Sequence, residues 1–104
     1  MMNDIPSPDT LGLNTLGLIE ESLHLAHEVG YHVREEPLGD LPGGPCVIGG
    51  RRTILLNLES TAADRLTVLL GVLAGDALAG SRPKSRLLAA RLHSATQGDA
   101  QGSD

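Results

Sequence analysis

Aromatic residues are nearly absent from this chain, which contains no Trp and no Phe and has Tyr31 as its single aromatic side chain. Aromatic side chains bury the largest area per residue, and they form the stacking platforms of proteins that bind single-stranded nucleic acid. The core must therefore be built from Leu, Val, Ile and Ala, and in a chain of 104 residues such a core is thin. Association would cover more apolar surface, so we expect a homodimer or a protein partner.

A second cysteine is also absent, so Cys46 has no partner for an internal disulfide, which fits a reducing compartment. Residues 1–8 include Asp4 and lack the apolar stretch of a secretory signal. The most apolar run, residues 66–79, is shorter than the ~20 residues that cross a bilayer, and it contains Asp76. These absences predict a cytoplasmic protein with no membrane partner.

Positive charge is scarce, because 8 Lys and Arg residues stand against 13 Asp and Glu residues, for a formal net charge of −5. This balance argues against a general affinity for nucleic acid, whose phosphates attract basic proteins. Half of the basic residues lie in residues 82–91, where they could contact RNA or an acidic partner. A solvated, partly frayed helix explains that stretch more simply.

Apolar periodicity predicts two main helices. The first is expected over residues 14–29, where apolar residues recur at spacings of three and four, and Gly30 is placed to end it. The second is expected over residues 61–79, beginning at a Thr61 N-cap and continuing with leucines at helical spacing. A weaker third helix is expected over residues 83–95.

Strands are expected between the two main helices. Residues 31–35 can form the first strand, and the Gly- and Pro-rich residues 37–45 then read as a surface loop. Residues 46–48 and 51–58 predict a β-hairpin, because the intervening Gly49–Gly50 pair can adopt the positive φ angles of a type I′ or II′ turn.

This order of elements predicts an α+β fold of the form αβββα. We expect a small antiparallel three-stranded sheet packed by two main helices, with the short third helix near the C-terminus. The expected organisation is a flexible N-terminal arm over residues 1–10, a single domain over 11–80, a weak basic helix over 81–96 and a disordered tail over 97–104.

The string from His27 to His32 is close to the zinc-peptidase motif H-E-x-x-H, in which two histidines at i and i+4 bind zinc and the glutamate activates water. His27 and His32 are one residue too far apart, at about 140° around a helix, and Gly30 is expected to end the helix between them. A second possible metal site uses Glu20, His24, His27 and Glu28, because residues three and four apart share a helical face. A solvated helix face is the simpler interpretation, so no metal site is predicted, and His24, His27, Glu28 and His32 are kept only as candidates.

Two other motifs fall short of a chemical site. Cys46 would be a nucleophile as a thiolate, but its place in a strand favours a small buried hydrophobe. The segment Gly44–Gly49 has the G-x-x-x-x-G frame of a phosphate-binding loop, but Gly50 and Arg51 follow it where Lys and Ser or Thr are needed. A hairpin is therefore the favoured interpretation of this segment.

The second helix carries the predicted interaction surface. Gly71 and Gly75 have the small-x-x-x-small spacing that lets another backbone approach closely. With the surrounding leucines, the residues expected to meet a partner are Leu66, Leu69, Leu70, Gly71, Leu73 and Gly75.

Residues 43–57, with the sequence GGPCVIGGRRTILLN, resemble small bacterial α+β proteins of unknown function that share a G-G-x-C hairpin between helices. This resemblance covers about residues 16–78 and implies the fold but no activity. The chain also resembles a minimal zinc-peptidase core, in which a strand ending in Asn precedes the helix that bears H-E-x-x-H. On that alignment Leu70, Gly71 and Ala74 stand at the metal-site positions, which implies a scaffold without its metal chemistry.

The predicted function is a non-enzymatic protein-interaction or self-association module that needs no cofactor. The alternative is a small zinc-dependent hydrolase that uses His24, His27 or His32 with Glu28. Bound zinc distinguishes the two, because only the hydrolase requires it.

Overall fold

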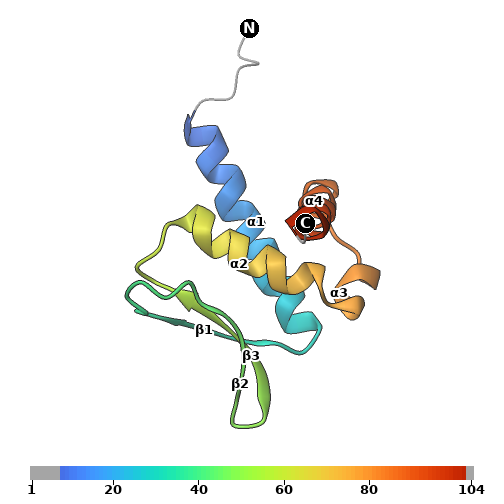
Figure 1. Cartoon of the computed structure of the whole chain (residues 1–104). Helices are drawn as coiled ribbons and strands as arrows, with labels where there is room; N and C mark the ends of the chain where they lie inside the picture. Colours follow the sequence, from blue (N-terminus) through green and yellow to red (C-terminus); the bar gives the residue numbers. More distant parts are fainter. Residues whose placement is uncertain (1–7, 103–104) are drawn as a thin grey trace, which may run out of the picture.

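Figure 1 shows the course of the chain in a computed structural model, which describes the backbone of residues 8–102 and the side chains of residues 14–96. The elements in chain order are α1 (Pro8–Glu28), β1 (His32–Glu36), β2 (Gly44–Ile48), β3 (Arg51–Asn57), α2 (Ala62–Ala74), α3 (Ala77–Ser81) and α4 (Arg86–Gly102). The predicted α+β class and the αβββα order of the main elements are confirmed.

The sheet is mixed, whereas the sequence predicts an antiparallel one. Its strand order is β1-β3-β2, and β2 and β3 form the predicted antiparallel hairpin around Gly49 and Gly50, whose φ angles are +58° and +79°. Positive φ at both turn residues is typical of a type I′ turn. β1 pairs with β3 in parallel, with Val33 opposite Ile54. The prediction of an all-antiparallel sheet was wrong because β1 lies on the far side of β3 from β2.

The loop over residues 37–43 is what takes the chain from β1 past the end of β3 to β2. The buried Asn57 side chain holds this loop: its Nδ2 donates to Gly39 O and Leu41 O at 2.9 Å each, and its Oδ1 accepts from the Leu38 N–H at 3.0 Å. The backbone N–H of Glu59, two residues after Asn57, donates to the same Oδ1 at 2.9 Å. The amide thus has two donors and two acceptor bonds in use, as a buried polar group requires.

Gly43 lies where this loop passes over β3. Its φ is +83°, and a Cβ atom built there would overlap the carbonyl oxygen of Leu55. Only glycine combines this backbone conformation with so close an approach. The crossing therefore depends on Gly43.

The first helix ends at the glycine that the sequence indicates. Gly30 has a φ of +97°, its N–H donates to His27 O at 3.1 Å, and the Tyr31 N–H donates to Ala26 O at 2.9 Å. This pair of hydrogen bonds satisfies carbonyls that the helix end would otherwise leave unpaired.

Helices α1 and α2 cover one face of the sheet, and α4 packs against them on the side away from the strands (Figure 1). Ile54 and Leu56 are fully buried under the two helices, because residues two apart in a strand share a face. The core of the described residues is aliphatic: it contains Leu18, Ile19, Leu25, Ala26, Val29, Ile54, Leu56, Leu66, Leu69, Leu70, Leu73, Ala79, Leu88 and Leu92.

The predicted second helix is divided in two. Thr61 is its N-cap, as expected, and accepts a hydrogen bond from the Asp64 N–H at 3.0 Å. α2 then ends at the Gly75 C-cap, and Asp76 begins α3 as a new N-cap. A glycine inside a helix followed by an N-capping acid is a stop signal and a start signal in succession, which outweighs the continuous apolar pattern.

Helix α4 contributes to the core, whereas the sequence predicts a weak basic helix outside the domain. Leu88 and Leu92 are buried in the same cluster as the leucines of α2. The Glu21 carboxylate of α1 accepts hydrogen bonds from the Ser85 N–H and hydroxyl at 2.7 Å each, and the Ser85 hydroxyl oxygen accepts from the Leu88 N–H at 3.1 Å. The start of α4 is therefore both capped and tied to α1.

Both end helices are longer than the sequence indicates. α1 begins at Pro8, before its predicted start, and Pro fits the first turn of a helix because no N–H is needed there. α4 continues to Gly102, past its predicted end, and no proline interrupts it. The rest of the predicted arm and tail, residues 1–7 and 103–104, lies outside the described residues.

Replacing Gly43 with Ala is expected to lower the free energy of unfolding by about 3 kcal/mol or more, because strain at positive φ adds to the overlap with Leu55 O. Gly49→Ala is the matched control, since it also has positive φ but has no atom within 4 Å of the added Cβ. That variant should lose only about 1 kcal/mol. Urea unfolding followed by circular dichroism measures both, and equal losses would show that the crossing at Gly43 is not tight.

Candidate functional site

An open hollow of about 470 Å³ lies where the end of α1 meets the start of the parallel β1 and β3 pair. Its lining combines two glycines with five side chains that carry polar groups: the residues are His27, Gly30, Tyr31, His32, Gly50, Arg51 and Arg52. Apart from the Tyr31 phenol, every ionisable side chain on this lining is a histidine or an arginine, whose charged form is positive. The hollow is therefore a basic site on an acidic chain.

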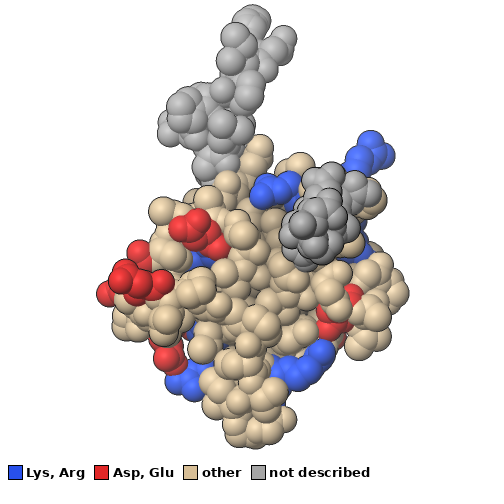
Figure 2. Space-filling view, in the orientation of Figure 1, with Lys and Arg blue, Asp and Glu red and all other residues tan. Residues whose placement is uncertain are grey.

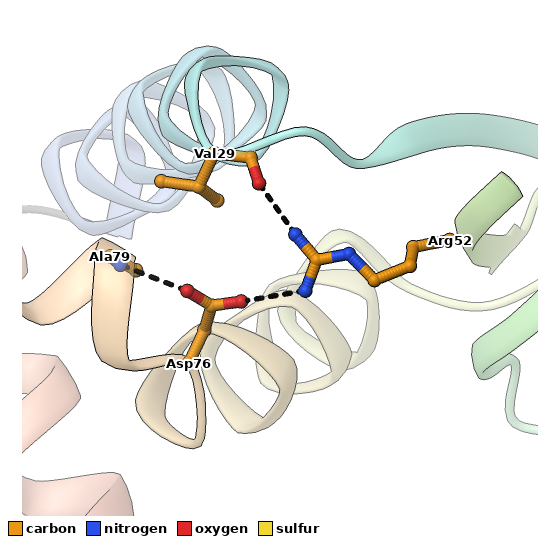
Figure 3. A network of polar contacts seen from close by, with 4 residues as sticks. All are labelled: Val29, Arg52, Asp76 and Ala79. Atoms are coloured by element: carbon orange, nitrogen blue, oxygen red, sulfur yellow. Dashed lines mark hydrogen bonds and ion pairs between the residues drawn. The ribbon is translucent and has the colours of Figure 1, made fainter.

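Arg52 holds the wall of this hollow in place (Figure 3). One end of its guanidinium group donates to Val29 O at the end of α1, at 2.6 Å, and the other donates to the Asp76 carboxylate at 3.1 Å. The guanidinium also lies over the Tyr31 ring, 4.2 Å from the ring centre. Arg52 leaves β3 toward the helix side of the sheet, as Ile54 does, because the two residues are two apart. A single side chain thus joins α1, β3 and α3.

Asp76 is the buried member of this network, with a side chain only 6% exposed against 48% for Arg52. Its second carboxylate oxygen accepts from the Ala79 N–H at 3.0 Å and so caps α3 (Figure 3). Burial by itself would raise the pKa of Asp76, but hydrogen bonds from Ala79, Arg52 and Tyr31 and the positive charge of Arg52 outweigh it. The pKa of Asp76 is therefore lowered, and the carboxylate stays ionised.

Tyr31 is affected in the opposite direction. Burial raises the pKa of its phenol, and the hydrogen bond to Asp76 and the negative charge of that carboxylate raise it further, against the opposing charge of Arg52. The Tyr31 hydroxyl is thus a neutral hydrogen-bond donor, and its ring supplies an apolar surface for the guanidinium.

The four candidate metal ligands are only partly brought together. His27 and His32 line the hollow, whereas His24 and Glu28 are exposed residues of α1 that do not line it. Across the described residues, no group of three or more His, Cys, Asp or Glu side chains is placed to hold a metal ion. The two histidines instead share their site with two arginines, which repel a cation.

The other two motifs lie in the β2–β3 hairpin. Cys46 is in a strand, as predicted, but it is half-buried, whereas the sequence favours a buried residue. The glycine-rich segment forms β2 and the hairpin turn, and β3 follows it where a phosphate-binding loop would need a helix. The hairpin interpretation is confirmed.

The predicted interaction residues of α2 are mostly internal. Its four leucines are buried in the core of the chain itself, which leaves only the two glycines exposed. Those leucines are Leu66, Leu69, Leu70 and Leu73, and the exposed residues are Gly71 and Gly75. A partner that approached α2 would therefore meet little apolar side-chain surface.

The sequence did not indicate the structural role of three polar residues, Arg52, Asp76 and Asn57. A local signal existed for Asp76, which follows a helix-ending glycine and precedes Ala79 by three residues, the spacing of an N-cap bond. No local signal existed for Arg52, whose partners lie 23 and 24 residues away in the chain.

Comparison with protein-family models, with curated proteins and with solved structures finds no match to this chain. Within residues 8–102, no helix combines the length and the apolar character that crossing a bilayer demands.

The ion pair makes stability depend on pH. Because the pKa of Asp76 is lower in the folded chain, its contribution is present above the unfolded pKa of about 3.9 and is lost as the pH falls through the folded value. Asp76→Asn keeps an N-capping oxygen but removes the charge, so it should cost about 1 kcal/mol at pH 7 and less near pH 3. Urea unfolding at the two pH values measures this difference.

Asp40→Asn is the matched control for that experiment, because Asp40 is exposed and no described residue binds its side chain. It should leave stability unchanged at both pH values. An Asp76→Asn penalty that stayed constant down to pH 3 would mean that the charge of Asp76 does not stabilise the fold.

Proposed function

We propose that the chain is a non-enzymatic self-association module in which β2 pairs with β2 of a second copy. The observation that supports it is the apolar edge of the sheet: Val47 is 69% exposed and Ile48 is 38% exposed. Among the described residues no strand pairs with the outer side of β2. In Figure 2 the hairpin, at the bottom of the view, is mostly uncharged surface flanked by basic groups.

The opposite edge of the sheet is much less suited to pairing. β1 carries charge along most of its length, and Arg34 and Glu36 form an ion pair on it. Charged side chains on an edge strand disfavour the addition of another strand, because pairing would bring them together and strip them of water. The two edges therefore differ in chemistry, and β2 is the one that favours a partner.

The backbone of β2 indicates which groups face outward. A two-residue turn makes Ile48 and Arg51 the closing hydrogen-bonded pair of the hairpin, so alternate residues of β2 bond to β3. Val47 and Pro45 then direct their backbone groups away from β3. Proline is tolerated at such a position because its missing N–H would have faced solvent.

Pro45 favours one register for a pair of β2 strands. If two copies meet antiparallel with Val47 opposite Val47, each Val47 N–H can bond to the other Val47 O, and Cys46 faces Ile48 across the pair. If they meet with Cys46 opposite Cys46, each Val47 O faces Pro45, which has no N–H to donate. The register centred on Val47 pairs apolar residues and makes reciprocal hydrogen bonds.

This proposal moves the expected contact from α2 to β2, because the leucines of α2 are buried. It needs no cofactor, and with the single Cys46 we place the protein in the cytoplasm as part of the same proposal. In the favoured register the two Cys46 Cα atoms are about 8 Å apart, too far for a disulfide. Reducing agent should therefore leave the dimer intact.

Val47→Lys tests the proposal, because a lysine at the centre of the pair places two like charges together. We expect wild-type protein at micromolar concentration to sediment as a dimer and Val47→Lys to sediment as a monomer with unchanged circular dichroism. Leu78→Lys is the matched control, since Leu78 is 57% exposed on α3, and it should remain a dimer.

A wild-type chain that stays monomeric at high micromolar concentration would refute the proposal. So would a Val47→Lys variant that dimerises as the wild type does, because the contact would then lie elsewhere.

A further inference from the structure

We infer that the basic hollow between α1 and the sheet binds a phosphate group of a small phosphate monoester. The lining brings His27, His32, Arg51 and Arg52 from two separate parts of the chain to one open space. The chain as a whole has a formal net charge of −5, so this local excess of basic groups runs against its composition. Guanidinium and imidazole N–H groups can donate hydrogen bonds to phosphate oxygens.

Arg52 is positioned before any ligand arrives. Its guanidinium is held by Val29 O, Asp76 and the Tyr31 ring, yet its side chain is 48% exposed. A group that is already ordered loses little conformational freedom on binding, and this favours affinity. The Asp76 carboxylate that balances its charge is buried and does not line the hollow.

Arg51 supplies the charge that remains free. Within the described part of the chain, no hydrogen bond or ion pair engages the side chains of Arg51, His27 or His32, and all three are exposed. Glu28, the residue that follows His27, is exposed on α1 but does not line the hollow. Arg51 and Arg52 are adjacent in β3, so they flank the hollow from opposite faces of the strand. An anion there would lie between one free guanidinium and one fixed guanidinium, with no carboxylate among the lining residues.

The glycines at the rim keep the site accessible. Gly30 and Gly50 line the hollow without side chains, and both have positive φ, at +97° and +79°. Arg52 occupies one face of the Tyr31 ring, and Tyr31 is the only aromatic residue in the sequence, so a nucleobase would find little stacking surface here. A compact phosphate monoester fits this chemistry better than a nucleotide, whose base would seek a stacking surface.

The test is a titration with inorganic phosphate at constant ionic strength, followed by amide NMR shifts. We expect saturable shifts confined to the residues around the hollow, with sulfate giving similar shifts and acetate much weaker ones, because one carboxylate offers fewer oxygens and less charge. Arg51→Gln should weaken phosphate binding about threefold to tenfold, since it removes one exposed charged donor.

Arg91→Gln is the matched control, because Arg91 is an exposed arginine of α4 outside the hollow. It should bind phosphate as the wild type does.

Three outcomes would overturn the inference. Shifts that rise linearly and spread over all basic residues would indicate general ion atmosphere effects. Binding unchanged by Arg51→Gln would place the site elsewhere. Equal affinity for acetate and phosphate would show a carboxylate site in place of a phosphate site.

Discussion

The guanidinium group of Arg52 is the interaction on which the arrangement of this fold depends. It is bonded to the last turn of α1 and to the carboxylate that starts α3, while its own backbone lies in β3. Three elements that are distant in the sequence therefore share one fixed point. Charge-assisted hydrogen bonds of this kind are stronger than neutral ones, and the buried carboxylate of Asp76 would be costly to leave without its partner. The chain has one aromatic residue and a thin aliphatic core, and the Arg52 network adds polar contacts to the apolar contacts of that core.

The small size of the chain also explains which surfaces the fold leaves uncovered. Two helices cover one face of a three-stranded sheet, and the leucines of α2 are used internally, together with Leu88 and Leu92 of α4. No described element remains to cover the outer edge of β2, so Val47 and Ile48 face solvent. The Arg52 network leaves basic groups around the hollow for a similar reason: it neutralises one arginine and leaves Arg51 free. The proposed pairing edge and the proposed anion site are both surfaces that a chain of this size does not close by itself.

Much of the fold could be predicted from local pattern, and much less of the site. The helix end at Gly30, the Thr61 N-cap and the Gly49–Gly50 turn follow from short-range sterics and hydrogen bonding, which act within a few residues. The sequence offered His27 and His32 only as candidate metal ligands, and they do line one hollow, but together with Arg51 and Arg52. The two arginines change the expected ligand of this hollow from a cation to an anion. The histidines and arginines come together because β1 pairs with β3 in parallel, and no local sequence pattern specifies that pairing.

The sequence by itself determined the element types, their order, the aliphatic character of the core and the turn of the hairpin, because each depends on neighbours within one turn or one strand. Only the tertiary structure decided that the sheet is mixed, that Asn57 and Gly43 carry the loop across β3, that α4 belongs to the core, and that Arg52 meets Asp76. Those outcomes depend on contacts between residues 12 to 64 positions apart, where many pairings satisfy the same local preferences and the packing of the whole chain selects one.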